Sequence, residues 1–342
     1  MSKAGRIISI TPPYAIPGGE IAIEVAGFEI NQTDDYGVYF DGKRARLVGA
    51  SGRRILAIVP EDFDSSDVEV HLENGGDRSE PFNLIVGKML ADDMHIVANP
   101  AVDPKDDSLI LTRSGSRGQH LPVTLFRLDA DGFLDELAAD VMNPTGIAFD
   151  QKGTFYVTNR SEGEVCRIEG DEEIIAFSTG LGIATGIAFD RDGVMYVGDR
   201  SGTIFRISDF GNAEAFATLE PSVSAYHLAF GSDGKLYVTA PGLASFDSVH
   251  VIDTAGFDTK FYRGLGRPQG LAFDRDGNLY VSACIESRRG IVRISPDGEK
   301  GEIFVAGNNV IGLCFSRKGE MLVATSEAVF SLPLGIYGTL LN

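Results

Sequence analysis

The sequence predicts an all-β protein, and three observations carry this prediction. One short apolar segment recurs five times, starting at Gly146, Gly186, His227, Gly270 and Gly312. These starts are 40, 41, 43 and 42 residues apart, and each unit contains four short strand-like stretches. Residues 1–88 lack the repeat but also alternate short strands with turn clusters. A fixed period in the low forties with four strands per unit is typical of a β-propeller, in which each repeat forms one blade.

Each unit begins with two strands joined by a tight turn. In the unit that starts at Gly146, the strand 146–149 is followed by a turn from Asp150 to Gly153 and then by Tyr156-Val157. The Asp side chain caps such a turn, and Gly supplies the positive φ that it needs. Tyr and Val favour the strand that follows. The third and fourth strands of this unit are expected at 165–168 and 174–177.

A degenerate first copy lies upstream of the five clear repeats. Leu109–Arg113 matches Phe155–Asn159, which brings the count to six blades over residues 89–342. Closing the ring protects the sheet edges, so a closed propeller is favoured over an open array. Two segments could supply the closing strand: the C-terminal stretch 335–341, or residues 89–97 ahead of the first copy.

Residues 1–88 read as about seven short strands, which predicts a small β-sandwich. The order of its motifs resembles the IPT/TIG immunoglobulin-like family, and the resemblance covers nearly the whole segment. Four motifs carry it, namely Ile8–Pro12, Pro17–Gly19, Val25–Phe28 and Val38–Gly42. The resemblance implies a binding or spacer module that could contact a protein partner.

Composition narrows the classes of partner. The chain has 342 residues and a net charge of −19, so it lacks the basic face that nucleic-acid phosphates require. Its three cysteines, Cys166, Cys284 and Cys314, have no spacing typical of a disulfide framework or zinc site. The N-terminus has no apolar leader and no segment reads as a membrane span. We therefore expect a cytoplasmic protein with no membrane partner, and a secreted form with its leader removed stays open.

The G-[IL]-A-F-D-x-x-G-x-x-Y-V units resemble NHL repeats and the six-bladed SMP-30/gluconolactonase-like group over most of residues 97–330. The lactonase branch of that group implies a divalent cation in the channel, held by an early Glu and by Asn or Asp just before several repeat glycines. Here those positions hold Thr145, Thr185 and Gln269, and His227 replaces a glycine. A hard cation usually needs carboxylates. We therefore expect no metal and no other cofactor.

Propeller loops that enter the first strand and leave the second strand converge on one mouth of the channel. Long loops at Arg113–Pro122, Ala240–Ser248 and Ala283–Gly290 are expected to wall one side of it. The candidate ligand-binding residues at this mouth are Arg113, Thr145, Arg160, Thr185, Arg200, Tyr226, His227, Gln269, Cys284 and Glu286.

The sequence leaves two classes of function open. The favoured one is a non-catalytic binding or scaffold protein whose channel mouth holds a small polar ligand, a glycan or a peptide. The alternative is a gluconolactonase-like hydrolase or a lyase acting in the channel. Fold alone does not decide between them.

Overall fold

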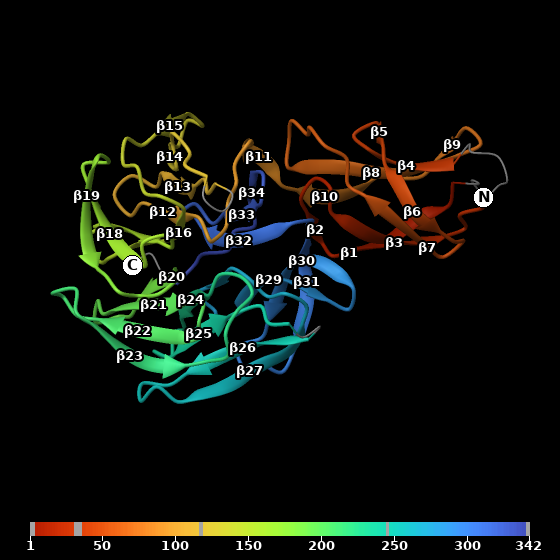
Figure 1. The fold of residues 1–342 in the computed structure, drawn as a ribbon. Coiled ribbons are helices and arrows are strands. Elements are labelled where there is room, and N and C mark those ends of the chain that lie inside the picture. Colours follow the sequence, from red (N-terminus) through yellow and green to blue (C-terminus); the bar gives the residue numbers. More distant parts are fainter. Residues whose placement is uncertain (1–3, 31–35, 116–118, 244–245, 340–342) are drawn as a thin grey trace.

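The computed structural model describes residues 4–30, 36–115, 119–243 and 246–339. Within these ranges every regular element is a β-strand, as the sequence predicts, and no helix is long and apolar enough to span a membrane. Figure 1 shows a ring of sheets with a smaller β-rich part attached to one side.

Six blades of four strands form the ring, one for each predicted blade; five are separate four-stranded sheets, and blade 5 is part of a 10-stranded sheet. Blade 1 holds β12 (Ala101–Val102), β13 (Leu109–Thr112), β14 (Leu125–Leu128) and β15 (Leu134–Glu136). Blade 2 holds β16 (Pro144–Phe149), β17 (Phe155–Asn159), β18 (Glu164–Glu169) and β19 (Glu173–Ser178). Blade 3 holds β20 (Ala184–Phe189), β21 (Met195–Asp199), β22 (Thr203–Ile207) and β23 (Ala213–Thr218). Blade 4 holds β24 (His227–Phe230), β25 (Leu236–Thr239), β26 (Asp247–Ile252) and β27 (Asp258–Leu265). Blade 5 holds β28 (Leu271–Phe273), β29 (Leu279–Ile285), β30 (Arg288–Ile294) and β31 (Gly301–Ala306). Blade 6 holds β32 (Val310–Phe315), β33 (Met321–Thr325), β34 (Val329–Leu332) and β11 (Lys88–Ala91).

Blade 6 shows how the ring closes. Its outer strand β11 comes from the segment ahead of the first repeat and pairs antiparallel with β34, placing Lys88 opposite Ser331. The C-terminal stretch instead forms an isolated bridge to blade 5, between Gly338 and Asp274. The last residues of the alternative closing segment, 340–341, lie outside the described residues. Strands from the two ends of the propeller segment thus share one blade, and this pairing closes the ring.

The repeated turn and the repeated Tyr have structural roles. In the turn of blade 2, the Asp150 carboxylate accepts the Thr154 N–H at 2.8 Å, and Gly153 has a φ of 74°. In blades 2 to 5, the Tyr of the second strand packs between a Phe of its own fourth strand and a Phe of the next blade. Tyr196, for example, lies 5.1 Å from both Phe216 and Phe230, in edge-to-face geometry. Such pairs stabilise the contact between blades.

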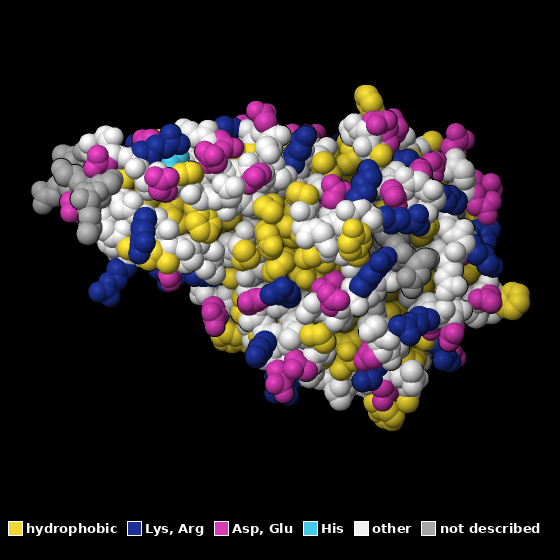
Figure 2. Space-filling model, turned by 180° about the vertical axis from the view of Figure 1, so that it is seen from behind, with side chains coloured by type: hydrophobic (Ala, Val, Ile, Leu, Met, Phe, Trp, Pro, Cys, Tyr) yellow, Lys and Arg dark blue, Asp and Glu magenta, His cyan; other side chains and the backbone are white. Residues whose placement is uncertain are grey.

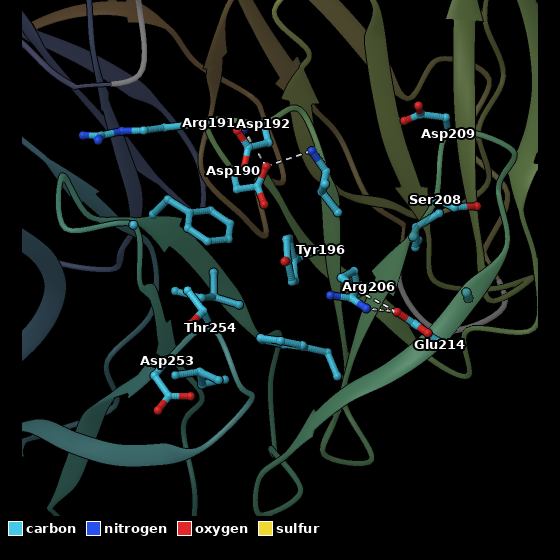
Figure 3. Close-up of a pocket in the computed structure, with 18 of the residues that line it drawn as sticks. Asp190, Arg191, Asp192, Tyr196, Arg206, Ser208, Asp209, Glu214, Asp253 and Thr254 are labelled. Carbon is cyan, nitrogen blue, oxygen red and sulfur yellow. Dashed lines mark hydrogen bonds and ion pairs between the residues drawn. The ribbon is translucent and has the colours of Figure 1, made fainter.

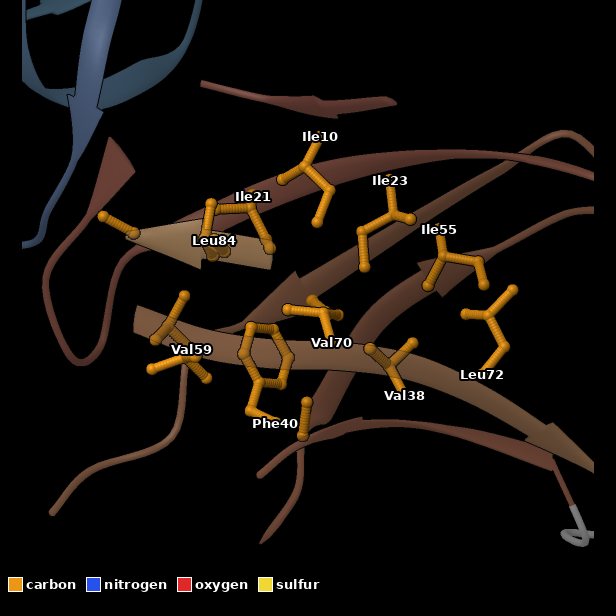
Figure 4. Packing of buried hydrophobic residues seen from close by; sticks show 14 of the residues in the cluster. Ile10, Ile21, Ile23, Val38, Phe40, Ile55, Val59, Val70, Leu72 and Leu84 are labelled. Atoms are coloured by element: carbon orange, nitrogen blue, oxygen red, sulfur yellow. The ribbon is translucent and has the colours of Figure 1, made fainter. Parts of the chain in front are cut away.

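Residues 6–86 form two sheets. One contains β1 (Arg6–Thr11), β3 (Glu20–Ala26), β6 (Arg46–Ala50) and β7 (Arg54–Ile58). The other contains β2 (Tyr14–Ala15), β4 (Tyr36–Phe40), β5 (Lys43–Arg44), β8 (Asp67–Asn74), β9 (Asp77–Arg78) and β10 (Phe82–Val86). Figure 4 shows alternate residues of both sheets, such as Ile21, Ile23, Val38 and Val70, packed into one core. The period-2 pattern of strands explains this alternation.

The two parts share a continuous sheet, which the sequence analysis did not predict. Strand β2 pairs in parallel with β10 on one side and with β31 of blade 5 on the other. Ile16, which follows β2, is fully buried in the core between blades 5 and 6. A Cβ atom on Gly19 would lie 2.5 Å from the Ala306 carbonyl oxygen, so the chain passes close to blade 5 here. The outer edge of blade 5 thereby gains a partner.

Candidate functional site

The mouth face is defined here as the propeller face that carries the connections into the first strands and out of the second strands. The structure divides the predicted ligand-binding residues of this face into two groups. Four have side chains buried inside the blades, namely Thr145, Thr185, Tyr226 and His227. The other six lie at the mouth. Glu286 is exposed, and five residues are half-buried, namely Arg113, Arg160, Arg200, Gln269 and Cys284.

The buried hydroxyl groups already have partners. Thr185 donates its Oγ1 hydrogen to the Gly198 carbonyl at 3.0 Å, and the same oxygen accepts the Tyr226 N–H at 3.0 Å. The Thr145 hydroxyl donates to the Asn143 carbonyl at 3.4 Å. The Tyr226 hydroxyl donates to the Glu220 carbonyl, and burial raises its pKa to about 12. These three side chains join neighbouring segments, so the structure gives them packing roles.

Hydroxyl groups on the second strands tie each blade to the next. Thr158 of β17 donates to the Thr185 carbonyl at 2.6 Å. Ser282 of β29 donates to the Val310 carbonyl at 2.6 Å, and Thr239 of β25 donates to the Gln269 carbonyl. The backbone of Gln269 is therefore committed to this network, and only its half-buried side chain faces the mouth.

Asn99 is a structural residue of the mouth that sequence analysis missed. Its amide donates to the Leu271 carbonyl of β28 at 3.0 Å, and its Oδ1 accepts the Leu313 N–H of β32 at 3.1 Å. A Cβ atom on Gly270 or Gly312 would lie 2.0 or 2.5 Å from that oxygen. The glycines of these repeats thus make room for the Asn99 side chain, which joins blades 1, 5 and 6. The Asn-Pro pair before the first copy was the available signal.

His227 occupies a position where four other repeats have glycine. In the two preceding blades a Cβ atom on Gly146 or Gly186 would lie 2.3 or 2.4 Å from a carbonyl oxygen of the next blade. His227 is only 2% exposed, and its Nε2 has no hydrogen-bond partner among the described residues. Burial lowers the pKa of His227 to about 4. The imidazole is therefore neutral near pH 7.

Arg160 and Arg200 are the charged pair of the mouth. They follow the second strands of blades 2 and 3, and each donates only to backbone carbonyls: Arg160 to Gly115 at 3.4 Å and Arg200 to Val223 at 2.9 Å. Burial and then the positive charge of Arg200 lower the pKa of Arg160. Among the described residues neither side chain forms an ion pair, and the Arg200 Nε is buried without a partner.

The remaining predicted residues are separate from this pair. Arg113 of blade 1 forms an exposed ion pair with Asp93 at 3.4 Å. The stretch expected as a long loop at Ala283–Gly290 is instead an extended hairpin of β29 and β30, with Cys284 opposite Arg289. Its two-residue turn is Glu286-Ser287, and both residues have positive φ, a geometry usually supplied by Asn and Gly. This uncommon turn sequence explains why the hairpin was not predicted. The other two long loops contain residues 116–118 and 244–245, which lie outside the described residues.

The side chains do not match the divalent-cation site that the resemblance implied. Within the described ranges, no three His, Cys, Asp or Glu side chains are grouped so that they could hold a metal ion. At the positions expected to carry ligands, the hydroxyls of Thr145 and Thr185 already donate to backbone carbonyls. A hard cation prefers several free oxygen ligands with carboxylates among them. The donor set therefore does not fit this metal.

A hollow lies on the opposite face, between blades 3 and 4. It encloses about 1150 Å³ and is shown in Figure 3. Three of its charged groups have partners: Asp190 accepts the Val194 N–H at 2.8 Å, and Arg206 forms an ion pair with Glu214. Tyr196 forms part of its wall. This hollow is therefore the outer end of the aromatic contact between two blades, and its charges serve the turns and strands around it.

A second groove, of about 460 Å³, lies where the N-terminal part meets the propeller. Pro13, Tyr14, Ile85 and Pro333 supply its apolar lining. Figure 2 shows hydrophobic side chains gathered at this junction. The groove contains Asp67 as its one charged residue, and it lies beside the shared sheet.

Several solved structures share the fold. A gluconolactonase from Xanthomonas campestris is 19% identical, with a TM-score of 0.58 over 72% of this chain and 88% of that chain. An auxiliary nutrient binding protein from Bacteroides thetaiotaomicron is 12% identical, with a TM-score of 0.56 over 96% of this chain and 97% of that chain. The virginiamycin B lyase from Staphylococcus aureus is 16% identical, with a TM-score of 0.54 over 92% of this chain and 99% of that chain. At these identities the likeness is one of fold.

A sequence comparison identifies the family. No curated protein matches the chain significantly. The model of the SMP-30/Gluconolactonase/LRE-like region matches residues 155–327, which span blades 2 to 6. This match covers half of the sequence and includes four of the five repeated units from which the resemblance was drawn. The chain therefore belongs to the SMP-30/gluconolactonase/LRE-like family.

Proposed function

We propose that this protein is a non-catalytic binding protein whose mouth face holds a small anionic ligand on Arg160 and Arg200. The observation that carries the proposal is the pairing of two half-buried guanidinium groups that have no carboxylate partner among the described residues. Arginine stays protonated in proteins and presents a planar set of donors that matches a carboxylate or phosphate.

The overall charge makes this pair unusual. The chain carries a net charge of −19, with 49 acidic residues available to neutralise 30 basic ones. Two adjacent, partly desolvated positive charges repel each other, and an acidic side chain placed between them would relieve this cost. An anionic ligand would relieve it in the same way. The donors are already oriented, since each guanidinium is held by a backbone carbonyl.

We further propose that residues 1–88 form an IPT/TIG-like immunoglobulin-type sandwich that acts as a spacer or contacts a protein partner, and that residues 89–342 form the ligand-binding domain. The two packed sheets and the motif order support this assignment.

A second candidate is a hydrolase acting on lactones, which family membership favours. It would need a cation, and the donors described above do not fit one. Incubation with gluconolactone, with and without added Ca²⁺, Mg²⁺ or Zn²⁺, tests this candidate directly. Metal-dependent turnover that is lost on mutation of mouth residues would replace the binding proposal.

Titration calorimetry with phosphate, acetate, gluconate and octanoate tests the binding proposal. At least one of these anions should bind, and Arg160→Gln and Arg200→Gln should each weaken its affinity about 10- to 100-fold, the value of a lost charge-assisted hydrogen bond. Arg191→Gln is the matched control, because Arg191 also donates to a backbone carbonyl, that of Ser232, but on the opposite face. Equal affinity in all three variants would contradict the proposal.

A further inference from the structure

Apolar side chains lie near Arg200, on the connections into blades 3 and 4 and on one connection within blade 4. Ile183 precedes β20, Val223 precedes β24, and Leu243 and Phe246 lie on the connection between β25 and β26. All four are exposed, with Leu243 at 96% and Phe246 at 77% of their full accessible surface. Exposed aliphatic and aromatic side chains that gather at one site commonly mark a binding surface.

Hydrogen bonds show that these residues adjoin Arg200. The Arg200 N–H donates to the Ile183 carbonyl at 3.2 Å, and its guanidinium donates to the Val223 carbonyl at 2.9 Å. The Val223 N–H donates to the Pro241 carbonyl at 2.9 Å, so the β25–β26 connection lies next to Val223.

That connection is folded back by a hydrogen bond from the Gly242 N–H to Asp247 Oδ1 at 3.2 Å. Leu243 and Phe246 follow Gly242 and precede Asp247 in the sequence, and Pro241 ahead of them is bonded to Val223. We call Ile183, Val223, Leu243 and Phe246 the apolar rim.

A free sugar acid would be a poor match for this surface. Its hydroxyl groups would need donors and acceptors, yet the hydroxyls of Thr185 and Tyr226 are buried and already bonded. With a sugar acid bound, the apolar rim would stay in contact with water. A ligand that covers the rim removes apolar surface from water, and this gain grows with each methylene group buried.

From this arrangement we infer that the ligand is a carboxylate carried on an apolar aliphatic or aromatic body. The carboxylate would lie on the guanidinium groups of Arg160 and Arg200, and the body would lie across Ile183 and Val223 toward Leu243 and Phe246. The Nε of Arg200 is buried and has no hydrogen-bond partner among the described residues. This inference rests on the proposed function, since it uses the same arginine pair.

The test compares acetate, butanoate, hexanoate and octanoate by titration calorimetry on the full chain, with gluconate and 1-octanol as reference probes. Affinity should rise roughly threefold for each methylene group that becomes buried. Octanoate should bind more tightly than gluconate, and 1-octanol should not bind measurably, because it lacks the charge.

Variants of the rim locate the apolar body. Val223→Thr and the double change Leu243→Ser with Phe246→Ser should each weaken octanoate binding about fivefold and leave acetate binding unchanged. Phe210→Ser is the matched control, since Phe210 is 89% exposed on the opposite face. All these positions are exposed, so the variants should fold, which circular dichroism checks.

The outcomes separate the two proposals. Tight binding of gluconate or phosphate with no gain from octanoate would overturn this inference and leave the binding function standing. Binding of hydrophobic peptides without binding of free aliphatic acids would also overturn it. Failure of all these anions to bind would overturn both proposals.

Discussion

His227 should make the stability of the protein fall at acidic pH. The imidazole is 2% exposed, and burial lowers its pKa to about 4 from an ordinary value of 6.5. The unfolded chain therefore binds a proton between these two pH values that the folded chain does not. The contribution of the buried, neutral imidazole to the free energy of unfolding is fully present above about pH 6.5. It is lost as the pH falls toward 4.

The size of this effect follows from the pKa difference. Each unit corresponds to 1.36 kcal/mol, so the shift of His227 amounts to about 3 kcal/mol in total and to about 2.5 kcal/mol at pH 4.5. Carboxylates also titrate in this range, so a control without the imidazole is needed. His227→Gln keeps a polar side chain of similar length and removes the titrating group.

Urea denaturation at pH 7.5, 6.5, 5.5 and 4.5 measures the effect, with fluorescence and circular dichroism as independent probes of unfolding. The wild-type protein should lose about 2.5 kcal/mol more than His227→Gln between pH 7.5 and pH 4.5. If the two proteins lose equal stability over this interval, the imidazole is not buried as described and the reasoning fails.

Three further changes test the packing of the ring and the junction. Gly270→Ala should lower the free energy of unfolding by more than about 3 kcal/mol or prevent folding, because its Cβ would meet Asn99 and the backbone of Gly312. Gly49→Ala is the control, because a Cβ there meets open space. Its free energy of unfolding in denaturant titrations should stay within about 0.5 kcal/mol of the wild-type value. Thr158→Val should cost about 1–3 kcal/mol, since the bonds to the Thr185 carbonyl and from the Gly146 N–H are lost, and equal denaturation midpoints would contradict this role. A protein truncated to residues 88–342 should remain β-rich by circular dichroism. It should melt at a lower temperature than the full chain, because β31 loses its partner strand β2. An unchanged melting temperature would show that the shared sheet adds no stability.

The strand pattern could be predicted from the sequence because its causes are local. The Asp150–Gly153 turn forms from residues within four positions of one another. The alternation of Tyr156 and Val157 with their neighbours sets the faces of a strand in the same way. Repetition of this local pattern at a fixed period then indicates the propeller and its family.

The candidate site could be predicted only in part. The repeat placed Arg160 and Arg200 at equivalent positions after the second strands, and the structure brings them close enough for their charges to interact. The same reasoning selected Thr185 and Tyr226 as ligand contacts. It could not show that Thr185 bonds to Gly198, or that the Tyr226 hydroxyl donates to the Glu220 carbonyl.

The sequence by itself determined the all-β class and the number of blades, and it placed Arg160 and Arg200 among ten candidate residues at the mouth. Only the tertiary structure decided which polar side chains stay available, how Asn99 joins three blades, and that β11 rather than the C-terminus closes the ring. It also decided that β2 extends blade 5 into the N-terminal part. The physical reason is distance along the chain. Turns and strands depend on neighbouring residues, whereas ring closure and the choice of hydrogen-bond partners depend on residues far apart in sequence, such as Asn99 and Leu313, which are 214 positions apart.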